Sequence, residues 1–183
     1  MSVSPKLQSA SRFMAGLSLF GALLLAILAP VSFLCPGELV HAGGLNLKIE
    51  AMLPNGVAIT RAVPFGWRLF ALAAAALPTG LMVATLVELF RLFRGFAAGR
   101  VFEGAVLAHF RRAAHFLFWS VVADIPAQAA ILYALGQAKG QFWLGYMISG
   151  FEPVFLFAVG VLVVISRVMA EAQRLADENA KFV

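Results

Sequence analysis

Charged residues divide this sequence into long apolar runs. Twenty-five uncharged residues separate Arg12 from Glu38, and nineteen separate Arg68 from Glu88. A helix needs about 20 apolar residues to cross a hydrocarbon core of about 30 Å. Each of these two runs therefore predicts a helix that spans a membrane.

Two more apolar runs follow, and each contains a single acidic residue. Asp124 lies in the run between Arg112 and Lys139, and Glu152 lies in the run of residues 140–166. The pattern as a whole predicts an all-α transmembrane fold, a four-helix membrane bundle that forms one domain of residues 1–183. The expected spans are about 13–34, 67–89, 113–135 and 151–168.

Two boundaries of these spans allow more than one interpretation. Proline is favoured in the first turn of a helix, so Pro153 predicts a fourth span that begins near Phe151. A continuous helix from Phe142 is the alternative. The first run is longer than the apolar region of a usual signal peptide and lacks a small-residue cleavage site, so we expect a true span there.

Lysine and arginine are distributed unevenly between the two sides of the predicted bundle. Ten lie on one side, in the N-terminal segment, the loop of residues 90–112, the end of the fourth span and the tail of residues 169–183. Four lie on the opposite side. Cytoplasmic segments carry an excess of these residues. The count predicts that both termini and the 90–112 loop are cytoplasmic, and that the loop of residues 35–66 is outside.

The outer loop carries signals for a small β structure. Residues 45–50 alternate apolar and polar side chains, which is the period of a half-exposed strand. Asn55-Gly56 is a strong hairpin turn signal, and residues 57–63 can return as a second strand. Residues 142–149 could add a third, since an isolated hairpin is marginally stable. We expect an extracytoplasmic hairpin or three-strand cap.

Composition agrees with a membrane location and excludes several function classes. The chain is 62% hydrophobic and only 13% charged, whereas soluble domains are about 25% charged. Its net charge of +5 is explained by topology, so direct nucleic-acid binding is not expected. Cys35 and His41 are too few for a metal site. No enzyme or cofactor motif is present, so we expect no catalytic residues, cofactor or metal.

A polar stripe marks the third predicted span. Asp124 lies about 16 Å along the helix from Ala113, close to the bilayer midplane. Ser120, Asp124 and Gln128 are four residues apart and share one helical face. Thr79 lies at a similar depth on the second span. An acid at this depth normally faces protein or a water-filled cavity. It either couples transport to protons or ions, or stabilises a helix pair as a neutral carboxyl group.

The predicted cytoplasmic loop combines arginine with phenylalanine and leucine. Such a loop favours the lipid headgroup layer, where guanidinium groups meet phosphate. Glu88 at its edge can reach Arg91 on its own helix, or the arginine pair across the turn. The candidate interaction residues are Arg91, Arg94, Arg100, Arg111 and Arg112 in the loop, with Glu178 and Asn179 in the tail.

Two stretches of the second half carry a family resemblance. The sequence LFRLF at 89–93 is followed by GRVF at 99–102 and a helix running to Arg111-Arg112, and the chain closes with LADENAKFV at 175–183. These motifs resemble those of the YoaS-like family, bacterial four-span membrane proteins with no assigned activity. Glu103 stands where members usually have Thr or Ser. The resemblance implies a cytosolic helix-turn-helix regulator as a candidate partner.

The sequence thus predicts a non-enzymatic, multi-pass protein of the bacterial cytoplasmic membrane. Its expected role is sensory, regulatory or accessory, with the basic loop and the C-terminal tail contacting a cytosolic partner. One alternative is a small transporter or channel that uses Asp124 and works as a homo-oligomer. Another is a structural subunit of a larger membrane complex. The bilayer, with its anionic lipids, is the other expected partner.

Overall fold

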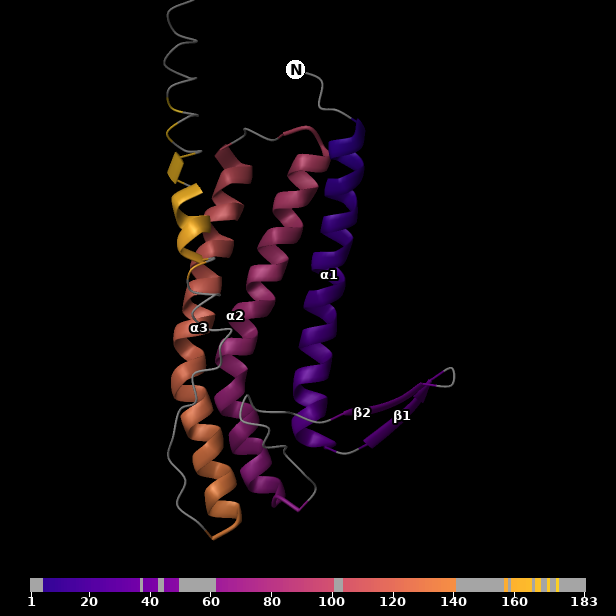
Figure 1. Cartoon of the computed structure of the whole chain (residues 1–183), viewed down its shortest axis with the longest axis vertical. Helices are drawn as coiled ribbons and strands as arrows, with labels where there is room; N and C mark the ends of the chain where they lie inside the picture. Colours follow the sequence, from indigo (N-terminus) through magenta and orange to yellow (C-terminus); the bar gives the residue numbers. More distant parts are fainter. Residues whose placement is uncertain are drawn as a thin grey trace, which may run out of the picture. The chain divides into compact units, whose positions relative to one another are not determined.

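The computed structural model describes most of the three long helices and a hairpin between the first two (Figure 1). The elements are α1 (Pro5–Leu34), β1 (Glu38–Ala42), β2 (Leu45–Ile49), α2 (Phe65–Ala97) and α3 (Gly104–Ala138). The described residues are 5–36, 38–42, 45–49, 62–100, 104–140, 157, 159–165, 167–168, 171 and 174.

All three long helices are long and apolar enough to cross a membrane. Their candidate spans are Gln8–Leu34, Phe65–Ala97 and Gly104–Ala138. At 1.5 Å per residue α2 and α3 are each about 50 Å long, which exceeds a hydrocarbon core of about 30 Å. Their ends therefore extend into the headgroup layers. The chain is a multi-pass integral membrane protein.

The predicted count of four spans is wrong. The described part of the chain holds three candidate spans, and the described residues within 151–168 form no fourth. Residues 159–165 and 167–168 are helical, whereas residues 151–156 lie outside the described residues. Apolar composition marks a stretch as compatible with lipid, but a crossing also needs a helix of about 20 residues. The N-in, C-in arrangement depended on an even number of crossings and loses its support with the count.

The β structure also differs from the prediction. β2 pairs in antiparallel register with β1, from Glu38 opposite Ile49 to Ala42 opposite Leu45. The predicted hairpin instead joined this strand to residues 57–63 through Asn55-Gly56, and that pairing is wrong. Two glycines separate β1 from β2 in the sequence, and Gly-Gly also favours tight hairpin turns. Residues 50–61 and the proposed third strand, 142–149, lie outside the described residues.

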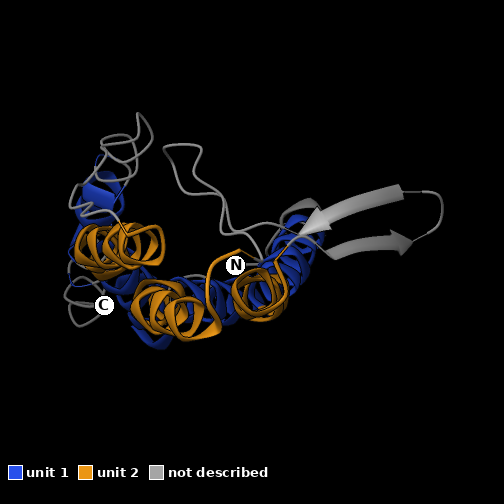
Figure 2. Ribbon diagram, turned by 90° about the horizontal axis from the view of Figure 1, so that it is seen from below, with its two compact units in different colours: residues 1–22, 82–118, 153–183 blue, residues 23–81, 119–152 orange. Residues whose placement is uncertain are grey.

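The chain forms two compact units, coloured separately in Figure 2. Unit 1 comprises Met1–Ala22, Met82–Phe118 and Pro153–Val183, and unit 2 comprises Leu23–Leu81 and Trp119–Glu152. Each long helix contributes to both units. The hydrophobic core described next belongs to unit 2, and the arginine-rich end of α2 and α3 belongs to unit 1.

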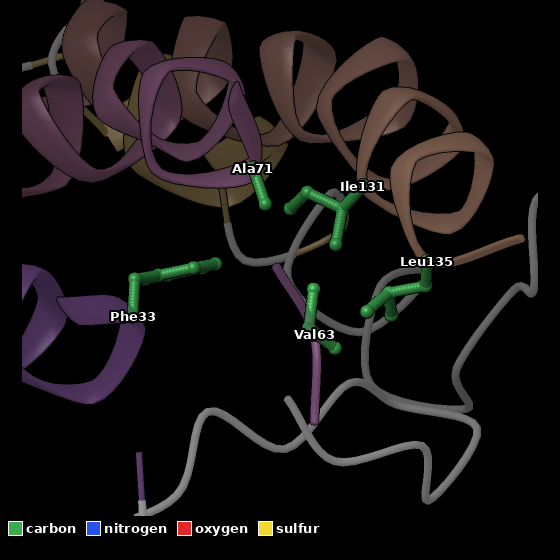
Figure 3. Packing of buried hydrophobic residues seen from close by; sticks show 5 residues of the cluster. All are labelled: Phe33, Val63, Ala71, Ile131 and Leu135. Atoms are coloured by element: carbon green, nitrogen blue, oxygen red, sulfur yellow. The ribbon is translucent and has the colours of Figure 1, made fainter. Parts of the chain in front are cut away.

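The core of unit 2 joins all three long helices. Phe33 of α1, Ala71 of α2, and Ile131 and Leu135 of α3 pack with Val63, which precedes α2 (Figure 3). On the same elements Trp67 packs edge-on against Phe70 and Tyr133, with ring centroids 6.0 and 6.3 Å apart. Edge-to-face pairs add about 0.5–1.5 kcal/mol to the burial of the rings.

In unit 1, α1 packs through small side chains. Its buried residues Ser11, Ala15, Ser18 and Ala22 recur every three or four positions, so they form one stripe. Small residues let membrane helices approach closely. Large apolar side chains such as Phe13 and Phe20 are exposed on the remainder of this helix segment, as expected for a surface that contacts lipid.

A glycine turn closes the hairpin of α2 and α3 in unit 1. Gly99 has a φ of 80°, its N–H donates to the carbonyl of Phe96, and the N–H of Arg100 donates to the carbonyl of Gly95. These bonds form a Schellman motif, in which a left-handed glycine ends a helix. A Cβ atom on Gly95 would lie 2.7 Å from Cγ2 of Val106, so the two helices are in close contact beside the turn.

Candidate functional site

A buried carboxylate joins α2 to α3 at the arginine-rich end of unit 1. Glu88 is only 5% exposed. Nη1 of Arg91 donates to Oε1 of Glu88 at 2.6 Å, and Oε2 lies 2.6 Å from Nδ1 of His109. An ionised carboxylate can only accept hydrogen bonds, so Nδ1 of His109 carries the proton. We call Glu88, Arg91 and His109 the Glu88 clamp.

The turn at Gly99 explains why these residues meet. Glu88 lies eleven residues before Gly99 and His109 lies ten residues after it. Helices of an antiparallel hairpin bring together residues that are equally far from the turn. Arg91 is the partner expected on the same helix, whereas His109 occupies the place across the turn that we expected for Arg111 or Arg112.

The sequence held a signal for this contact that our interpretation did not use. Gly99 marks the centre of the helix hairpin, and counting outward from it pairs Glu88 with His109. His109 was not among the candidate interaction residues. Within the described ranges no three His, Cys, Asp or Glu residues are placed to hold a metal ion.

The clamp satisfies a charge that would otherwise be expensive to bury. Each oxygen of Glu88 has its own partner, and hydrogen bonds to charged groups contribute about 1.5–3 kcal/mol. The side chain of Arg91 is 52% exposed and that of His109 25% exposed, so both reach from the buried carboxylate to the surface. The clamp therefore fixes α2 against α3 and also fixes the position of one surface guanidinium group.

The remaining loop arginines are also exposed. Besides Arg91 these are Arg94, Arg100, Arg111 and Arg112, all in unit 1. The guanidinium group of Arg94 lies 5.5 Å from the ring centroid of Phe90. Between residues 82 and 118, Glu88 is the single acidic residue that the structure describes. This end of the hairpin therefore carries a strong excess of positive charge.

The polar stripe on α3 has a simpler arrangement. Nε2 of Gln128 donates to Oδ2 of Asp124 at 2.5 Å, one turn along the same helix. Gln128 and Ser120 are buried and Asp124 is half-buried. No hydrogen bond among the described residues joins Asp124 to Thr79, the partner suggested by depth. The roles predicted for these four residues stay predictions.

The predicted C-terminal interaction residues, Glu178 and Asn179, lie outside the described residues. Just before them, Glu171 and Arg174 are helical and form an exposed ion pair at 2.9 Å. This pair has the same spacing as Glu88 and Arg91 but a solvated environment, where an ion pair contributes about 0–1 kcal/mol.

Comparison with known proteins identified no similar protein. No protein-family model, no curated protein and no solved structure matches the chain. The resemblance of the connector and tail motifs to the YoaS-like family stays a prediction.

Proposed function

We propose that this chain is a non-enzymatic regulatory or accessory protein of the bacterial cytoplasmic membrane. In this proposal the α2–α3 connector contacts a cytosolic protein. The observation that carries the proposal is the Glu88 clamp, which fastens the two helices together directly beside the exposed arginines of the connector.

The helix ends on both sides of this connector are held in place. The Schellman motif at Gly99 ends α2 at a defined residue, and the contact of Gly95 with Val106 fixes the helix spacing. A surface that is already ordered loses less conformational entropy when a partner binds. Such pre-organisation is typical of a recognition surface, whereas retention of a loop in the cytoplasm needs only its positive charge.

Two arginines are best placed to reach a cytosolic protein. Arg94 lies within the last turn of α2, and Arg100 follows the glycine turn. We call these two the tip arginines. They lie farthest along the hairpin from the apolar part of the span. A partner that recognises them would present an acidic surface, and the candidate that the family resemblance implies is a helix-turn-helix regulator.

The transport alternative lacks a supporting observation. Asp124 bonds to Gln128 on its own helix, and that contact supports a role in stabilising α3 around Pro126. A coupling site would instead use the acid to hold an ion or a proton between helices.

The orientation of the connector can be tested with the native cysteine. Cys35 is exposed and directly follows α1, and it is the one cysteine of the chain. A membrane-impermeant maleimide should label Cys35 from outside intact cells. In a Cys35→Ser background, Arg100→Cys should react only after the membrane is opened. Reaction of both cysteines from the same side would contradict the orientation, and labelling in detergent controls for thiol reactivity.

Contact with a cytosolic protein can be tested by capture on the full chain in lipid nanodiscs. A cytosolic protein should be retained by the native chain and lost after Arg94→Glu with Arg100→Glu, because charge reversal repels an acidic surface. Lys139→Gln, at an exposed position in the other unit, serves as the control. Retention that is unchanged by charge reversal of the tip arginines would exclude this function.

A further inference from the structure

Arg91, Arg111 and Arg112 lie at the level where the hydrocarbon core meets the lipid headgroups. On α2, Arg68 and Glu88 bound an uncharged segment and are twenty residues apart, or about 30 Å along the helix. That length equals the thickness of a bilayer core. Glu88 therefore marks one boundary of the hydrocarbon, and its contact with His109 marks the same boundary on α3.

Helix geometry brings the guanidinium groups of both helices toward this level. Arg91 lies about 4.5 Å from Glu88 toward the connector, whereas Arg111 and Arg112 lie about 3–4.5 Å beyond His109 toward the hydrocarbon. A helical Cα–Cβ bond tilts toward the N-terminus of its helix. This tilt carries Arg91 inward to Glu88, with which it bonds, and carries the α3 pair outward to the boundary. We call Arg91, Arg111 and Arg112 the deep arginines.

Within the part of the chain that the structure describes, the arginines of α3 at this boundary have no acidic partner. The carboxylate of Glu88 is already engaged by Arg91 and His109. Arg111 and Arg112 are exposed, and neither guanidinium group bonds to a described residue. Ala113 and Ala114 beside them are buried, so the pair cannot turn into the protein interior. Lipid phosphates of the headgroup layer are available to them as counterions.

We propose that the deep arginines bind the phosphate groups of anionic phospholipids at this boundary, with the acyl chains along the apolar faces of α2 and α3. Guanidinium groups bind phosphate oxygens in pairs, through parallel N–H donors. A cytosolic protein would have to enter the headgroup layer to reach this level, which favours lipid as the occupant. Glu88 acts as a positioning residue, since it holds Arg91 at the boundary. This site goes beyond the proposed partner contact, which uses the tip arginines.

The experiment measures lipid bound to the full chain in detergent with no cytosolic protein present. The chain is mixed with equal amounts of phosphatidylglycerol and phosphatidylcholine with identical acyl chains, and bound lipids are counted by native mass spectrometry. Phosphatidylglycerol should be retained preferentially. Arg111→Gln with Arg112→Gln should weaken its binding about 5-fold per arginine, the equivalent of about 1 kcal/mol each. Arg94→Gln with Arg100→Gln should weaken it less than the deep pair does.

Matched variants of Arg111 and Arg112 separate the loss of phosphate binding from a loss of charge or of folding. Arg111→Lys with Arg112→Lys preserves the charge and should bind with an intermediate loss, because lysine binds phosphate as a point charge. The single Gln variants replace the double variant if it does not fold. Equal losses from deep and tip pairs, or no preference for the anionic lipid, would overturn the site. Displacement of the lipid by millimolar inorganic phosphate would overturn it in favour of a soluble phosphate site. None of these outcomes bears on capture of a cytosolic protein.

Discussion

Replacing Glu88 with glutamine should lower the free energy of unfolding by about 2–3 kcal/mol. The amide keeps the shape of the side chain but removes its charge, and it can no longer accept on both sides. One of the two donors, Nη1 of Arg91 or Nδ1–H of His109, then faces an NH₂ group. The loss falls below that of a fully buried pair because Arg91 is half exposed and regains water. Unfolding by a denaturing detergent, followed through tryptophan fluorescence, measures it.

The chain supplies a matched control for this variant. Glu171 and Arg174 form a Glu–Arg pair with the same spacing, but their side chains are 56% and 64% exposed. Glu171→Gln should therefore change stability by less than about 1 kcal/mol. Equal losses of stability in the Glu88 and Glu171 variants would show that burial of the Glu88 clamp contributes nothing to the free energy of unfolding.

A second measurement isolates the contact across the turn. Glu88→Gln and His109→Gln each remove one side of the same hydrogen bond. Residues in one network are not additive, with interaction energies of about 0.5–3 kcal/mol. The double variant should therefore lose less stability than the two single losses combined. Strict additivity would mean that Glu88 and His109 stabilise the fold independently.

The spans show which part of this fold a sequence can predict. The apolar runs correctly predicted helices that include residues 13–34, 67–89 and 113–135, because exclusion from water depends on local composition. All three helices begin before the predicted spans, and α2 and α3 also end beyond them. α1 begins at Pro5, since proline suits the first helical position and polar residues can continue a helix into the headgroup layer. The predicted number of spans was wrong because apolar composition alone does not establish a helix that is long enough to cross the membrane.

Pairing across a distance was harder to predict than local structure. The alternation of residues 45–49 correctly indicated a strand, but the choice of its partner depended on two competing turn signals. Asn55-Gly56 is the stronger signal by type, yet the strand pairs with residues 38–42. The site repeats this lesson. The contact of Arg91 with Glu88 follows from helical spacing, whereas the contact with His109 required the centre of the helix hairpin.

Gly95→Ala should destabilise the hairpin of α2 and α3 by about 1–2 kcal/mol, despite the better helix propensity of alanine. The added Cβ would lie 2.7 Å from Cγ2 and 3.1 Å from Cγ1 of Val106. Valine is branched at Cβ and has one strongly preferred rotamer in a helix, so its methyl groups cannot turn away cheaply. The two helices must move apart instead, which also strains the Glu88 clamp one to two turns away.

Two further variants separate this clash from a general effect of alanine. Gly80→Ala lies in the same helix with nothing within 4 Å of the new methyl group, so it should be neutral or stabilise by up to about 1 kcal/mol. Val106→Ala removes the atoms that clash, so combining it with Gly95→Ala should recover part of the lost stability. Phosphatidylglycerol binding should weaken in the same variants that lose stability, because strain in the Glu88 clamp releases Arg91 from the boundary. Unaltered stability of Gly95→Ala would mean that the helix spacing at the turn is not fixed by this contact.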